Sequence, residues 1–165
     1  MKKIIIVGLM AGFLSACAAS GSIQTTSTAP VVDSNQSASV DVQSVLPDKA
    51  DSAQALRNAI ASQLVNKKAF RSITDSSSSD YLLRVTVTNV SEVSQGARIL
   101  LGALAGQASI SASCEVVDRK QDKVIGSMTT NAKSSGGHIF AGTTQEAIDI
   151  AATQIVDYLL QNRKL

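Results

Sequence analysis

The chain has 165 residues, with 15 basic and 13 acidic side chains and a formal net charge of +2. This balance and the lack of a basic stripe argue against a nucleic-acid-binding protein. With no Trp, two Tyr and three Phe, the chain offers few rings for stacking on bases or sugars, so we expect a core of Val, Ile, Leu and Ala.

The N-terminal segment is organised like a bacterial signal peptide. Two lysines form a basic start, and residues 4–16 form an apolar run shorter than the about 20 residues of a membrane-spanning helix. The run ends in Leu-Ser-Ala-Cys at residues 14–17, which resembles the lipobox of bacterial lipoproteins at all four positions. An ordinary secretory signal, cut near Ala16 or Ala19, is the alternative.

The lipobox resemblance implies that residues 1–16 are removed and that Cys17 becomes the first residue. Its sulfur would then carry a diacylglycerol thioether and its amine a third acyl chain. Since each buried methylene contributes about 0.8 kcal/mol, three chains are expected to anchor the protein permanently. Ala18 stands where inner-membrane lipoproteins have Asp, which implies the bacterial outer membrane, facing the periplasm. Without Lys2 and Lys3 the mature chain is formally neutral, so its acyl chains alone are expected to contact the membrane.

The segment after the cysteine is rich in Ser, Thr, Ala and Gln. Such a composition buries too little apolar surface to offset the entropy of ordering the chain. We therefore predict a flexible tether over residues 17–38, with a reach of about 25 Å, followed by a single domain over residues 39–165.

The domain is predicted to begin with a strand and a helix. Residues 39–46 alternate imperfectly between apolar and polar side chains, which predicts a strand. Residues 49–67 are predicted to be helical, with Asp48 as the cap. Apolar residues at spacings of three and four give this helix one buried stripe, formed by Ala53, Leu56, Ile60 and Leu64. Phe70 and Ile73 belong to a short strand or turn.

A meander of three strands is predicted next, over residues 81–94, 107–118 and 123–133. A charged turn at residues 119–122 joins the last two. Alternation in the middle strand places Cys114 inward, as a small buried hydrophobe. Because acylation consumes Cys17, an intermolecular disulfide or a reactive thiol is the alternative for Cys114.

The last predicted element is a helix over residues 143–161. Thr143 or Thr144 caps it, and Glu146 stands where a capping box places an acid. Its wide apolar stripe consists of Ala147, Ile148, Ala151, Ile155, Val156 and Leu159. The elements together predict an α+β two-layer sandwich, in which two helices cover one face of a small, mostly antiparallel sheet of three to four strands. The other face, lined by Ser and Thr, is expected to be wet.

Residues 95–106, QGARILLGALAG, are unusually apolar for a connection between two strands. A hairpin with long strands and glycine bulges, an apolar loop that packs against a partner or the membrane surface, and a short helix with a Gly-xxx-Gly contact are the three interpretations. A phosphate-binding loop is disfavoured because no Lys-Ser/Thr follows. The candidate partner contacts here and in the loop 135–140 are Ile99, Leu100, Leu101, Leu104, His138 and Phe140.

The sequence contains no pattern that indicates an enzyme. His138 is the single histidine, the acidic residues lie apart, and no spacing is typical of a zinc site. A Cys–His nucleophilic pair would need Cys114 exposed beside His138, and the alternation argues against that exposure. We therefore expect a non-enzymatic protein with no cofactor and no metal. A carrier that holds a lipid or glycan between sheet and helices is the alternative function.

Loose glycine and hydrophobic patterns extend over about residues 50–163. They comprise Gly96-Ala97-Arg98, Val116-Val117-Asp118, Lys123-Val124-Ile125-Gly126 and the glycines Gly136, Gly137 and Gly142. With the amphipathic helix that follows, this order resembles a family of small bacterial lipoproteins known as domain of unknown function 4410. The family has no established activity, so the resemblance implies no functional residue. We expect an interaction or envelope-structural module with an unidentified protein partner.

Overall fold

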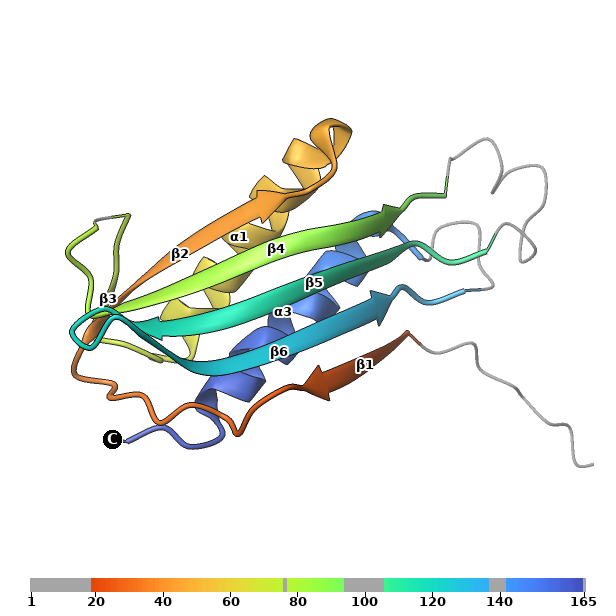
Figure 1. Ribbon diagram of the computed structural model, residues 1–165. Coiled ribbons are helices and arrows are strands. Elements are labelled where there is room, and N and C mark those ends of the chain that lie inside the picture. The colour runs from red at the N-terminus through yellow and green to blue at the C-terminus, as the bar shows by residue number, and fades with distance from the viewer. Residues whose placement is uncertain (1–18, 76, 94–105, 137–141, 165) are drawn as a thin grey trace, which may run out of the picture.

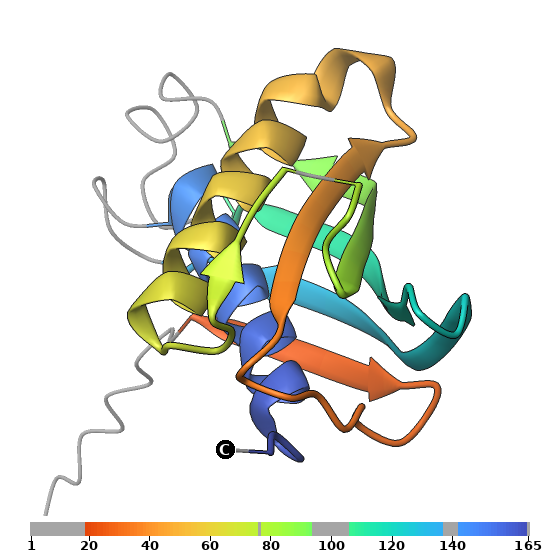
Figure 2. The same cartoon turned by 90° about the vertical axis from the view of Figure 1, so that its left-hand side faces the viewer.

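The computed structural model describes residues 19–75, 77–93, 106–136 and 142–164. In this part of the chain, a six-stranded sheet carries two helices on one of its faces (Figures 1 and 2). The elements are β1 Ser20–Thr25, β2 Ser37–Ser44, the 3-10 turn Pro47–Lys49, α1 Ala50–Asn66, β3 Ser72–Ile73, β4 Tyr81–Ser91, β5 Ser109–Asp118, β6 Lys123–Lys133 and α3 Thr144–Leu160. The strand order across the sheet is β1-β6-β5-β4-β2-β3.

The sheet is mixed. β1, β6, β5 and β4 pair antiparallel in that order, whereas β2 runs parallel to β4 and to the short β3. The parallel pair is possible because α1 returns the chain from the end of β2 to the start of β4. The predicted α+β sandwich with two helices on one face is confirmed. The predicted three to four mostly antiparallel strands are wrong in detail, since six strands are present and β2 makes the sheet mixed.

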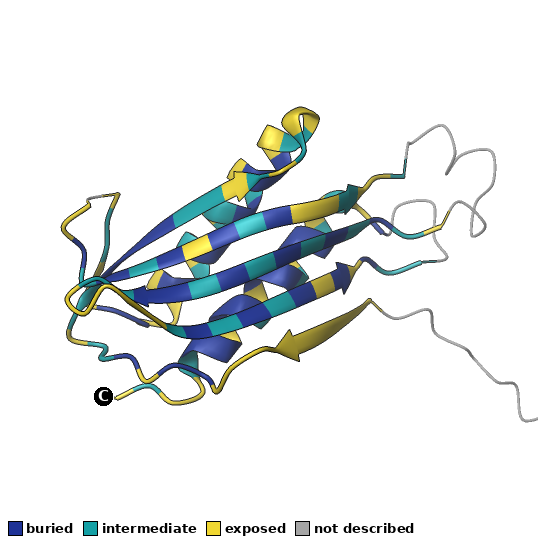
Figure 3. Cartoon of the chain, in the orientation of Figure 1, coloured by how far each residue is buried: buried dark blue, intermediate teal, exposed yellow. Residues whose placement is uncertain are grey.

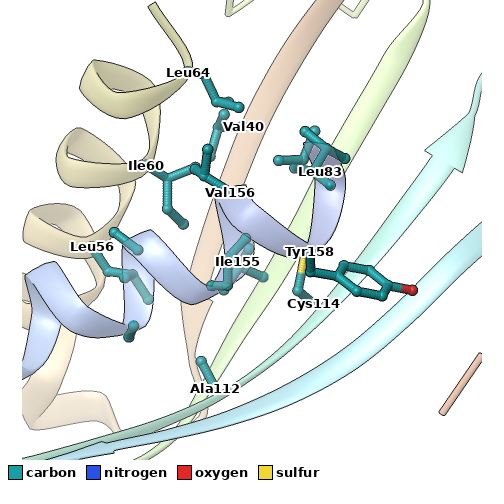
Figure 4. Packing of buried hydrophobic residues seen from close by; sticks show 14 of the residues in the cluster. Val40, Leu56, Ile60, Leu64, Leu83, Ala112, Cys114, Ile155, Val156 and Tyr158 are labelled. Atoms are coloured by element: carbon teal, nitrogen blue, oxygen red, sulfur yellow. The ribbon is translucent and has the colours of Figure 1, made fainter. Parts of the chain in front are cut away.

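The core lies between the sheet and the two helices. Alternate residues of β4 and β5 point into it, and α1 and α3 contribute the stripes that their spacing predicts (Figure 4). The fully buried side chains include Leu56, Ile60, Leu64, Leu83, Val85, Ile110, Ile155 and Leu159. Cys114 is 1 % exposed, as the alternation in its strand predicts.

The expectation of a flexible tether over residues 17–38 is wrong for the residues that the structure describes. Ser20–Thr25 form β1, which pairs with β6 along its whole length, from Ser20 opposite Lys133 to Thr25 opposite Met128. The chain then crosses the end of the helix layer, where Ala29 and Val32 are buried. The ordered domain therefore begins before residue 39.

We call residues 26–36, which connect β1 to β2, the crossing segment. It is held by side chains from the end of α3 and the loop beyond it. The Tyr158 hydroxyl donates to the carbonyl of Thr28 at 3.3 Å, and Asn162 Nδ2 donates to the carbonyl of Ala29 at 3.0 Å. Composition did not predict β1 because every side chain of this strand is exposed, so its sequence needs no alternating apolar pattern. Its stability comes from backbone hydrogen bonds to β6, which composition does not record.

The helix starts differ from one another. Asp48 does not cap α1, because Pro47–Lys49 form a 3-10 turn that leads directly into the helix and its N-cap, Lys49, makes no side-chain cap bond. Thr143 caps α3 as predicted, and its Oγ1 accepts the backbone N–H of Glu146 at 3.1 Å. Within the described residues, neither helix is long and apolar enough to cross a membrane.

Candidate functional site

The residues that the sequence singles out for function fall outside the part that the structure describes. They are the acylation candidate Cys17 and the predicted contacts Ile99, Leu100, Leu101, Leu104, His138 and Phe140. A candidate site therefore has to be built from the described strands, helices and pockets.

Cys114 has the properties of a structural residue. Burial, and to a smaller extent the neighbouring Glu115 carboxylate, raises the pKa of its thiol to about 12. A thiol in that state holds almost no thiolate at neutral pH, and the thiolate is the nucleophile. Among the described residues, no group of three or more His, Cys, Asp or Glu side chains is placed to hold a metal ion.

Along β4, β5 and β6, buried residues alternate with half-buried or exposed residues (Figure 3), and many of the latter are uncharged polar residues on the face turned away from the helices. Strand register aligns one row across five strands, formed by Gln24, Thr129, Ser113, Thr86 and Gln43. A second row lies on the same face, two residues farther along β1, β6 and β5, and is formed by Ser22, Asn131, Ser111 and Asn89. We call these two rows the open face. Their hydroxyl and carboxamide groups can donate and accept hydrogen bonds, but they supply no acid or base near neutral pH.

Charged side chains on this side of the sheet begin beyond the open face, toward the β5–β6 hairpin. In the next row, Arg84 of β4 contacts Glu115 of β5, with 3.2 Å between Nη1 and Oε2. Beyond them Lys120 contacts Asp80 at 2.8 Å. Lys120, with the backbone N–H and hydroxyl of Ser37, holds the pKa of Asp80 well below its ordinary value. The open face is thus bordered by charged side chains, by the Arg84–Glu115 pair toward the hairpin and by Lys133 at its other end.

A pocket of about 320 Å³ lies at the edge of β2, beyond the short pairing with β3. It is lined by Ser39, Val40, Asp41, Arg57, Asp75, Ser77, Leu82 and Arg119. Arg57 reaches across the strand edge, where its Nε donates to the carbonyl of Val40 at 3.2 Å and its guanidinium pairs with Asp75. The buried Nε of Arg119 has no hydrogen-bond partner among the described residues. Two arginines and two aspartates leave the pocket formally neutral.

A second pocket, of about 440 Å³, follows the outer side of α3 near its first turn. Its lining comprises Ala19, Thr143, Gln145, Glu146, Asp149, Ile150, Thr153 and Gln154. None of the described residues that line it is basic, so this lining supplies no positive charge to attract an anion. This pocket shows where the chain enters the fold, because Ala19, one residue before β1, lies beside the first turns of α3.

Sequence reasoning found part of this arrangement. Alternation predicted that Ser and Thr of the strands would lie on the open side of the sheet, and those of β5 and β6 do, except Thr130, which is buried and hydrogen-bonds to Gln154 of α3. It missed the rows themselves, because strand register is a long-range property and β1 carries no periodic signal. The pocket at the β2 edge also has no local signal, since its lining comes from residues 39–119.

A model of the family described as domain of unknown function (DUF4410) matches residues 22–137, which is more than half of the chain. The chain belongs to the DUF4410 family. The match begins within β1, so the DUF4410 domain includes a segment that composition assigns to a tether. A comparison with curated proteins gives no match.

Solved structures share the fold of this DUF4410 chain. PelC from Paraburkholderia phytofirmans, solved as a dodecamer, is 15 % identical with a TM-score of 0.64, and the match covers 88 % of this chain and 100 % of that chain. A PelC variant in another space group gives 0.62 at 15 % identity, covering 85 % and 97 %. Protein XCC0632 from Xanthomonas campestris, of family DUF330, gives 0.52 at 15 % identity, covering 81 % and 88 %. At such identities the likeness shows a common fold alone.

Proposed function

We propose that this protein is a lipid-anchored, non-enzymatic interaction module of the bacterial outer membrane, facing the periplasm. Acyl chains on Cys17 hold it to the membrane, and a protein partner binds the domain. The lipobox at residues 14–17 supports the anchor. The apolar residues Ile99, Leu100, Leu101 and Leu104, with His138 and Phe140, remain predicted partner contacts.

The observation that carries the interaction role is the open face. It spans five strands, it is covered by no described element, and its side chains are Ser, Thr, Asn and Gln. A surface of this kind offers many hydrogen bonds and little apolar area, which suits a contact that forms and dissociates. β1 adds a second feature, since it is an edge strand of six exposed residues with no proline and no charge to block strand addition.

The burial of Cys114 supports a non-enzymatic role, because a buried thiol with a raised pKa cannot act as a nucleophile. The packing of the core weighs against the alternative of a lipid or glycan carrier. Apolar side chains from α1, α3 and the sheet fill the layer where the carrier would hold its ligand (Figure 4). We therefore favour the interaction module.

Photo-crosslinking in living cells tests the interaction role. A benzophenone amino acid replaces Ser113 at the centre of the open face or Ser22 on β1, and Ser62 on the exposed side of α1 serves as the matched control. We expect adducts of defined mass from Ser113 and Ser22 and none from Ser62. An adduct of twice the chain mass identifies a second copy of this chain as the partner, and PelC was solved as a dodecamer. Equal adduct patterns at all three positions would contradict the proposal.

The anchor is tested separately. Radiolabelled palmitate is expected to label the parent chain and not Cys17→Ser, which should remain as uncleaved precursor. Incorporation that persists in Cys17→Ser, or parent protein that fractionates with the soluble periplasm, would remove the anchor from the proposal.

A further inference from the structure

The link between the proposed anchor and the sheet is very short. β1 begins at Ser20, only three residues after Cys17. At about 3.3–3.6 Å per residue, three residues span at most about 11 Å. A flexible tether over residues 17–38 would have allowed the domain to tumble freely, whereas this link holds one part of the sheet close to the bilayer.

The register between the strands identifies the part of the sheet that lies next to this link. Ser20 lies opposite Lys133, Lys133 opposite Ser109, and Ser109 opposite Ser91. These four residues form a row where β1 and β5 begin and β6 and β4 end, and we call this row the serine end; the strand ends can be followed in Figure 1. Two connections leave the sheet here, between β4 and β5 and between β6 and α3. Several strand ends therefore lie together at the end of the sheet where β1 begins.

The opposite end of these strands is the β5–β6 hairpin. β6 has 11 residues, so the two ends are about 35 Å apart at about 3.3 Å per residue. The hairpin end is densely charged, because five of the six residues 118–123 are Asp, Arg or Lys. The row at the serine end carries one charge, that of Lys133, and Glu92, next to Ser91, forms an ion pair with Lys49 at 3.2 Å. Charge alone therefore does not choose between the two ends, and the short link from Cys17 to Ser20 is what favours the serine end as the side nearer the bilayer.

We propose that the serine end lies on the lipid headgroups, with the strands leading away from the membrane and the hairpin end in the periplasm. This orientation rests on the proposed acylation of Cys17. The serine hydroxyls donate hydrogen bonds to headgroup oxygens, and Lys133 contacts a lipid phosphate. The open face then stands roughly upright, where a partner in the periplasm can reach it.

Depth-dependent quenching tests the orientation. Acylated protein with Ser91→Cys or Gln121→Cys is labelled with a fluorophore and placed in vesicles of phosphatidylethanolamine and phosphatidylglycerol that carry a headgroup nitroxide. The parent chain, whose Cys114 is buried, controls for labelling at other positions. We expect quenching at Ser91 to exceed quenching at Gln121 by at least about threefold, because the two labels differ in height by tens of ångströms.

Equal quenching at both positions, which a domain lying flat or tumbling would give, overturns the orientation. The mass of the same sample separates this failure from failure of the anchor, since an unacylated chain contradicts the proposed function instead. Lys133→Glu should lower quenching at Ser91, while Lys123→Glu at the hairpin end should not. Unchanged quenching in Lys133→Glu would overturn the phosphate contact.

Discussion

At the scale of single residues, Cys114 shows how burial removes reactivity. In the folded Cys17→Ser chain at about pH 8, we expect iodoacetamide to alkylate Cys114 at least about 100-fold more slowly than in denaturant, because its pKa is raised to about 12. Mass spectrometry of samples quenched at timed intervals measures the two rates. Similar rates in the two conditions would show that the thiol is accessible.

Asp80 joins two distant parts of the chain. Its Oδ2 accepts the backbone N–H and the hydroxyl of Ser37, each at 2.8 Å, and its Oδ1 lies 2.8 Å from Lys120 Nζ. Lys120 first, and then the Ser37 donors, hold the pKa of Asp80 well below its ordinary value of 3.8. Folding thus favours the carboxylate, whose contribution to stability is present above the unfolded-state pKa and is lost as the pH falls through the folded-state pKa.

Asp80→Asn is therefore expected to flatten the loss of stability on acidification below about pH 4. Urea midpoints at neutral and acidic pH measure this effect. Lys120→Gln keeps both Ser37 donors and should flatten the curve only in part. A steep acid dependence that persists in Asp80→Asn would assign it to other carboxylates.

At the scale of elements, β6 approaches the crossing segment and α3 so closely that position 126 has no room for a side chain. A Cβ on Gly126 would lie 2.8 Å from Pro30 Cδ and 2.9 Å from the Tyr158 hydroxyl. We expect Gly126→Ala to destabilise the domain by about 1–3 kcal/mol, because Pro30 and Tyr158 must move. Urea unfolding measures the change, and Thr129→Ala on the open face of the same strand should cost far less. Equal stability of Gly126→Ala and parent would place the segment farther from β6.

β1 gives a test of the ordered N-terminal segment. Amides of residues 20–25 that bond to β6 should exchange with deuterium orders of magnitude more slowly than those of an unstructured chain. Hydrogen-exchange mass spectrometry of peptides from this region measures the rates. Exchange at the rate of a free peptide throughout residues 20–25 would contradict the pairing of β1 and support a flexible tether instead.

At the scale of the whole molecule, the sequence predicted those elements whose pattern is local. Alternation located β5 and β6, and helical spacing located α1 and α3 with their buried stripes. The sheet could not be assembled in the same way, because β1 has only exposed side chains and β3 has two residues. The open face depends on register between strands distant in sequence. Its composition was predictable from alternation, and its alignment was not.

The pairing of β1 with β6 also affects the order in which parts of the chain fold. Hydrogen bonds near these strands join residues 100 positions apart, such as Ser27 and Ser127. Contacts between distant residues form late, since closing the intervening loop costs entropy. β1, the first strand to be synthesised, can therefore pair only after β6, the last strand of the described chain, has been made. Under the proposed export and acylation, the segment beside Cys17 is expected to stay accessible to the acylating enzymes until most of the chain has crossed the inner membrane.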